Sequence, residues 1–115
     1  MALPLADYAS IAALVSAFCD VVSFGRESLE DSYRRYLADP NAQRRGAILK
    51  NTYSDDELES IRDRVKHCQE QFVQTGDGEG RKRCLCFVLK QAKIGNGGNL
   101  PFPEWEKTFD RLRCA

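Results

Sequence analysis

The sequence is poor in the features that usually identify an enzyme or a binder of charged polymers. It has one histidine, and its 17 basic and 17 acidic residues give a formal net charge of zero. No global positive field therefore attracts nucleic acid or an anionic membrane surface. With a single histidine and no Gly-x-Ser-x-Gly segment, there are few ways to pair a nucleophile with a base. We expect no catalytic residue, no metal and no cofactor.

Targeting and membrane-spanning segments are missing from the pattern as well. No basic residue precedes the first apolar stretch, whereas a secretory signal begins with a cationic region. Residues 8–24 are rich in apolar side chains, but Ser10, Ser16, Asp20 and Ser23 interrupt them. A membrane span needs about 20 largely uninterrupted apolar residues. We therefore expect a soluble, cytoplasmic protein that does not bind membranes.

The five cysteines are odd in number, which does not suit a fully paired disulfide framework. Cys84 and Cys86 form the only close pair. Two residues apart on a helix, they would point about 200° away from each other and could not share one metal ion. Because free cysteine commonly behaves as a small buried apolar residue, we predict reduced, structural thiols. The alternative is disulfide or metal chemistry at Cys68, Cys84, Cys86 or Cys114.

Apolar residues at helical spacing, in contrast, run through almost the whole chain. The 115 residues, 43% of them hydrophobic, are enough for one domain with its own core. Helix-start signals accompany the apolar pattern. Ser54 and Glu57 form a capping box, and Ser28 is placed to cap another helix. Asp39 is expected to cap a short helix with Pro40 at its first position.

These patterns predict an all-α fold, a compact bundle of about five to six helices, two of them short, in one domain over residues 1–115. Residues 84–89 also suit a buried strand, but their charged flanks and the scarcity of strand partners favour a helix over 81–94. A long helix is expected from Ser54 to about residues 75–76. Trp105 is expected to be a partly buried anchor of the last helix. The predicted core contains Leu14, Phe18, Leu58, Ile61, Val65, Phe72, Leu85, Val88, Leu89, Phe109 and Leu112.

Charge is distributed unevenly along the chain. Residues 54–80 contain eight acidic and three basic residues, a formal charge of −5. Residues 81–115 contain eight basic and three acidic residues, a formal charge of +5. In one interpretation, the acidic and basic helices face and neutralise each other within the chain. In the other, the bipolar surface docks another protein.

For the charge pattern alone, neutralisation within the chain is the simpler interpretation. The size of the chain, the lack of a catalytic constellation and the bipolar charge together nevertheless favour a small helical protein–protein interaction module. It would be an adaptor, a regulatory subunit or an inhibitor-type protein without catalytic activity, and its partner would be another protein or a second copy of itself. A nucleic-acid-binding helical domain and a cysteine-dependent redox or metal-binding protein are the alternatives. Arginine is enriched at interface hot spots, so we look for contacts among basic clusters. The candidate partner-binding residues are Arg34, Arg35, Arg44, Arg45, Arg81, Lys82 and Arg83.

Overall fold

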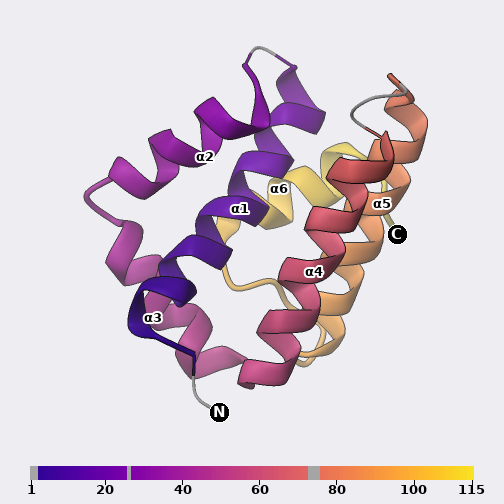
Figure 1. The fold of residues 1–115 in the computed structure, drawn as a ribbon. Helices are drawn as coiled ribbons and strands as arrows, with labels where there is room; N and C mark the ends of the chain where they lie inside the picture. Colours follow the sequence, from indigo (N-terminus) through magenta and orange to yellow (C-terminus); the bar gives the residue numbers. More distant parts are fainter. Residues whose placement is uncertain (1–2, 26, 73–75) are drawn as a thin grey trace.

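The computed structural model describes residues 3–25, 27–72 and 76–115, and these residues form α-helices and connecting turns with no strand. The all-α prediction is confirmed. Figure 1 shows α2 and α3 on one side of α1, with the α4–α5 hairpin on the other and α6 behind α1. The helices are α1 (Leu5–Phe24), α2 (Leu29–Ala38), α3 (Ala42–Thr52), α4 (Asp55–Phe72), α5 (Gly78–Ile94) and α6 (Pro103–Arg111).

The two expected serine caps are present at the starts of α2 and α4. Ser28 Oγ accepts a hydrogen bond from the backbone N–H of Asp31 at 3.1 Å. At α4, Ser54 Oγ accepts from the Glu57 N–H at 3.1 Å, and Glu57 Oε1 accepts from the Ser54 N–H at 3.0 Å. This reciprocal pair satisfies two backbone donors that the first turn of a helix leaves free.

Two other predicted helix boundaries differ from the structure. Helix α3 begins at Ala42, because Asp39 accepts from the backbone N–H of Asn41 at 2.7 Å and so closes a turn before the helix. Helix α5 begins at Gly78 rather than at Arg81, because Asp77 Oδ1 caps it by accepting from the N–H of Gly80 at 2.9 Å. The predicted end of α4, near residues 75–76, falls largely outside the described residues; the helix is described as far as Phe72.

Helix α1 is the centre of the fold and packs against all five other helices. Its closest neighbour is α3, where a Cβ on Gly46 would lie 2.7 Å from the backbone nitrogen of Ala9. By length and composition alone, the stretch Ala6–Phe24 is long and apolar enough to cross a membrane, although its polar residues argue against a membrane span. In this structure 56% of the stretch is buried inside the protein.

Most of the predicted core is buried. Phe18, Leu58, Ile61, Val65, Leu85, Val88, Leu89 and Phe109 are buried, whereas Leu14, Phe72 and Leu112 are half-buried at its edge. The expectation for Trp105 is wrong, because its side chain is only 1% exposed and lies fully within the core. The core also includes Tyr8, Leu49, Tyr53, Leu100 and Phe102, which come from helix ends and loops.

The prediction of reduced cysteines is wrong for four of the five. Cys68 of α4 and Cys84 of α5 form one disulfide, and Cys86 forms another with Cys114 near the end of the chain. Their Cα atoms are 5.8 and 5.1 Å apart, within the range that a disulfide spans. Cys84 and Cys86 do diverge on α5, as helix geometry requires. As a result, each meets a different partner.

Cys19 is the one free cysteine that the structure describes, and it is buried. Burial raises the pKa of its thiol to about 12, which disfavours the reactive thiolate form near neutral pH. The cytoplasmic location expected from the sequence stays a prediction.

Candidate protein-interaction surface

Four acidic side chains line the outward face of α4: Asp56, Glu59, Asp63 and Glu70. Their spacing of three, four and seven residues places them within about 60° of the helix circumference. Glu59 is half-exposed and the other three are exposed. We call these four residues the acidic stripe. Carboxylates three and four residues apart repel one another, so the stripe favours positive charge from outside the helix.

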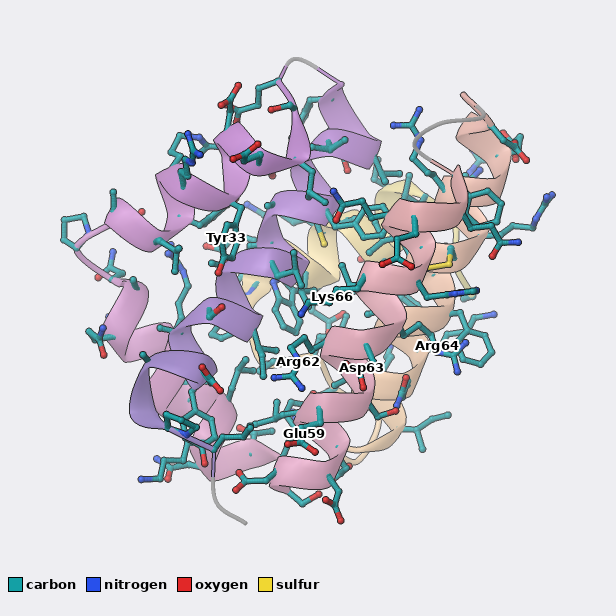
Figure 2. The ribbon with its side chains drawn as sticks, in the orientation of Figure 1. Tyr33, Glu59, Arg62, Asp63, Arg64 and Lys66 are labelled. Carbon is teal, nitrogen blue, oxygen red and sulfur yellow. A yellow bond between two sulfur atoms is a disulfide. The ribbon has the colours of Figure 1, made fainter. Side chains whose placement is uncertain are left out.

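The three basic residues of α4 lie to the sides of the acidic stripe. In Figure 2, Arg62 and Lys66 lie on the side of α4 that faces α1 and α2, near Tyr33, whereas Arg64 lies on the side that faces α5. Arg62 and Lys66 line a cavity of about 220 Å³ whose wall includes Leu14 and Tyr33. The outward face is therefore acidic although the helix contains three bases.

The outward face of α5 carries a second stripe, made of Arg83, Phe87, Lys90 and Ile94. The spacing of four, three and four residues again confines these side chains to about 60° of the helix circumference. Phe87 is 54% exposed and Ile94 is 82% exposed, whereas the other large apolar side chains described as exposed, Phe24 and Leu37, lie on other helices. We call these four residues the basic–apolar stripe.

Helices α4 and α5 are held side by side along a line of contacts between the two stripes. Gln91 Nε2 donates to Ser60 Oγ at 2.8 Å, and the Arg64 guanidinium lies over the Phe87 ring, 4.3 Å from its centroid. The disulfide between Cys68 and Cys84 links the helices further along the same line. The hairpin therefore presents both stripes from a backbone that is cross-linked covalently.

The opposite charges of the hairpin do not neutralise each other through ion pairs. Among residues 3–25, 27–72 and 76–115, no ion pair joins α4 to α5; Arg62 approaches only its neighbour Asp63, at 3.5 Å. The interpretation in which the acidic and basic helices neutralise each other within the chain has no such contact to support it. Both stripes are directed to solvent.

Of the candidate basic residues on α2, Arg35 is engaged within the chain. Its guanidinium contacts Asp20 at 3.0 Å and Glu27 at 2.7 Å, and these carboxylates raise its pKa. Tyr36 donates its hydroxyl to the same Asp20 carboxylate at 2.7 Å. Arg35 therefore fastens α2 to the end of α1. Arg34 pairs with Glu30 one turn earlier on α2.

The two arginines of α3 differ from each other. Arg45 is directed inward: 19% of its side chain is exposed, it lies 3.7 Å from Asp39, and it stacks over the Tyr36 ring at 5.4 Å. Arg44 is exposed, at the edge of a cavity of about 310 Å³ between α3 and the start of α6. Neither residue belongs to the α4–α5 face.

The predicted cluster at the start of α5 is split by the helix. Arg81 is half-buried and lines a cavity of about 510 Å³ that also contains Glu27 and Glu30, and Lys82 is half-buried. Arg83 is exposed and belongs to the basic–apolar stripe. Arg83 thus belongs to the basic–apolar stripe, whereas the other six candidate residues belong to neither stripe.

Sequence reasoning missed the rest of both stripes. Phe87 lies within the apolar run 84–89, and the total charge of a segment does not show which side of a helix each charge occupies. A projection at 100° per residue would have aligned Asp56, Asp63 and Glu70, since they recur every seven residues. No group of three or more His, Cys, Asp or Glu side chains in the described part of the chain is arranged to hold a metal ion.

Comparisons with protein-family models, with curated protein sequences and with solved structures find no match to this chain. The functional argument therefore depends on the residues described above, and chiefly on the outward-facing side chains of α4 and α5.

Proposed function

We propose that this chain is a small helical protein–protein interaction module, of adaptor, regulatory or inhibitor type, with no catalytic activity of its own. Its partner binds the exposed face of the α4–α5 hairpin. The observation that carries the proposal is the pair of adjacent stripes of opposite character, with no ion pair between the two helices among the described residues.

The composition of this face suits a protein partner better than a small ligand. Phe87 and Ile94 expose apolar surface whose removal from water would favour binding. Aromatic residues and arginine are also enriched among the few interface residues that contribute most of the binding free energy. The surrounding carboxylates and ammonium groups suit the rim, where charge steers association and sets orientation. The disulfide between Cys68 and Cys84 keeps the two helices in register, which lowers the entropy lost on binding.

The predicted basic contact residues enter the proposal in different ways. The side chains of Arg44 on α3 and of Lys82 and Arg83 on α5 make no hydrogen bond or ion pair with described residues, so they remain candidate contacts. Arg34 and Arg35, in contrast, pair with carboxylates inside the chain. Replacing Arg35 consequently tests the attachment of α2 to α1 as well as binding.

The alternatives have less support from the same geometry. A nucleic-acid site at residues 81–83 would need its cations exposed, but Arg81 and Lys82 are half-buried, and Arg81 shares its cavity with Glu27 and Glu30. A cysteine-dependent catalyst would need an accessible thiolate, whereas Cys19 is buried with its pKa raised to about 12. Binding to a generic DNA duplex that weakens steeply with added salt would favour the first alternative over our proposal.

The test uses the oxidised protein as bait in an extract of the cell that makes it, followed by purification of whatever protein it retains. The affinity of that partner is then measured for the wild type and for the double variant Lys90→Glu/Ile94→Glu. We expect binding at least tenfold weaker, which corresponds to about 1.4 kcal/mol. The control is Lys107→Glu at an exposed position of α6, which reverses one lysine charge away from the hairpin as Lys90→Glu does on it. Equal affinities for all three proteins would refute this siting of the interface.

A further inference from the structure

The partner that fits the α4–α5 face is a second copy of this chain. We infer that two copies associate about a twofold axis, so that the acidic stripe of each meets the basic–apolar stripe of the other. This inference rests on the proposed function and names its partner. Its basis is the charge complementarity of the two stripes, which lie side by side on one hairpin.

Symmetry decides which helix meets which. A twofold axis that lies in the interface and runs parallel to the hairpin exchanges the two sides of the face, and so places α4 of one copy on α5 of the other. An axis across the hairpin would place α4 on α4 and α5 on α5, with like charges opposed. The distribution of charge therefore selects the parallel axis, and with it a closed dimer in which every contact occurs twice.

The same axis determines which residues meet, because it preserves height along the hairpin. Ser60 contacts Gln91, and Arg64 contacts Phe87, so Asp63 and Lys90 lie at nearly the same level of adjacent helices. In the dimer, Asp63 of one copy comes to face Lys90 of the other. The cation–π pair of Arg64 and Phe87 lies along the line between the helices, and hence near the centre of the interface.

Association would relieve two features that are unfavourable in the single chain. The acidic stripe places like charges at spacings where they repel, and cations supplied by a second copy offset that repulsion. Phe87 and Ile94 are 54% and 82% exposed, and a second copy would cover them. Covering the Arg64–Phe87 stack would also exclude water from it, which strengthens a cation–π contact.

The first measurement is the mass of the oxidised full chain in solution by analytical ultracentrifugation, from micromolar to millimolar concentration. We expect a reversible rise to twice the chain mass of 13.0 kDa, with no larger species. Added salt should shift the equilibrium toward the single chain, because the rim contacts are charged. A protein that stays monomeric at millimolar concentration overturns the inference. Growth beyond the dimer also overturns it, because it indicates head-to-tail contacts that do not close.

The second measurement uses two charge reversals at exposed positions, Asp63→Lys and Lys90→Glu. Each variant alone should self-associate at least tenfold more weakly, because each opposes like charges twice in its own dimer. An equimolar mixture of the two should recover a dimer. In this mixed dimer the introduced lysine of one variant faces the introduced glutamate of the other. The remaining contact joins Lys90 to Asp63, as in the wild type. The double variant Asp63→Lys/Lys90→Glu should recover self-association for the same reason.

Matched controls on α6 are Asp110→Lys and Lys107→Glu, both at exposed positions away from the hairpin. These should leave self-association unchanged, and circular dichroism should show unaltered helicity for all variants. If the two hairpin variants do not pair with each other in the mixture, the proposed register is wrong.

The inference and the proposed function fail in different ways. If the wild type is monomeric but still binds a captured partner through Lys90 and Ile94, the dimer is refuted and the proposed interaction function is kept. In the opposite case, the captured partner binds equally well without Lys90 and Ile94, but the dimer depends on Lys90. That result would support the dimer and would show that the captured partner binds another surface.

Discussion

Trp105 on α6 donates its indole Nε1–H to the Oγ of Ser16 on α1 at 3.0 Å, across 89 residues of sequence. Both side chains are buried, and the Trp105 ring also meets Phe102 edge-on, with 4.8 Å between ring centroids. A buried indole N–H requires an acceptor, and the central helix supplies it. This polar contact, within an apolar environment, helps attach the last helix to the core.

Replacing Ser16 with alanine should lower the free energy of unfolding by about 1–3 kcal/mol, because it leaves the buried indole N–H without a partner. Ser23→Ala is the matched control on the same helix, since the Ser23 Oγ is buried without a hydrogen bond in the described structure. We expect that change to be neutral or slightly stabilising. Chemical denaturation followed by tryptophan fluorescence measures both, and equal losses would contradict the importance of the Trp105 contact.

Removing the disulfide between the helices of the hairpin should destabilise the protein. The double variant Cys68→Ala/Cys84→Ala should lose about 2–4 kcal/mol, because the cross-link limits the freedom of the unfolded chain. Urea titration with and without reductant checks this, since reductant should affect the variant less than the wild type. If the wild type unfolds identically in both conditions, the disulfide does not contribute to stability.

The thiols can be counted directly. Unfolded in denaturant without reductant, the protein should react with one equivalent of a thiol reagent, at Cys19, and after reduction with five. In the folded state, alkylation of Cys19 near pH 8 should be very slow, because burial raises its pKa to about 12 and blocks access. Five reactive thiols in unreduced, unfolded protein would contradict both disulfides.

The crossing of α1 and α3 depends on the absence of a side chain at Gly46. We expect Gly46→Ala to cost about 1–3 kcal/mol, because its Cβ would lie 2.7 Å from the backbone nitrogen of Ala9 and would force the helices apart. Gly78→Ala in the first turn of α5 is the control. Nothing lies within 4 Å of its new Cβ, so it should be neutral or stabilise by about 0.4–1 kcal/mol. Thermal unfolding of both variants gives the comparison.

Acid should weaken the contact between the first residues of α4 and the start of the chain. Asp55 accepts hydrogen bonds from the Tyr8 hydroxyl at 2.7 Å and from the Leu3 backbone N–H at 3.0 Å. These bonds lower the pKa of Asp55 in the folded state. Its contribution to stability is therefore complete above the ordinary aspartate pKa and is lost as the pH falls through the lower, folded value.

The matched variant for this pH dependence is Asp55→Asn, which cannot ionise. It should be less stable than the wild type at neutral pH, and the difference should shrink as the pH falls below about 4. Urea unfolding at a series of pH values measures this. A difference that does not change with pH would show that the charge of Asp55 contributes nothing to the contact.

The helices were predictable because their signals are local. The capping box of Ser54 and Glu57 lies within one turn, and the stripe of Leu58, Ile61 and Val65 depends only on the helical period. The start of α5 was missed for a local reason too. The helix was expected over 81–94, although Asp77 is a residue type that commonly caps helices.

The sequence by itself determined that this chain is all-helical, where most of its helices lie and which apolar faces form the core, because these depend on residues within a few turns of one another. Only the tertiary structure decided which cysteines pair, that Arg35 is held by Asp20 and Glu27, and that the acidic and basic faces of α4 and α5 lie adjacent without ion pairs between them. These features depend on distances between residues far apart in the chain, 28 positions for Cys86 and Cys114 and 31 for Ser60 and Gln91, and helical periodicity contains no information about them.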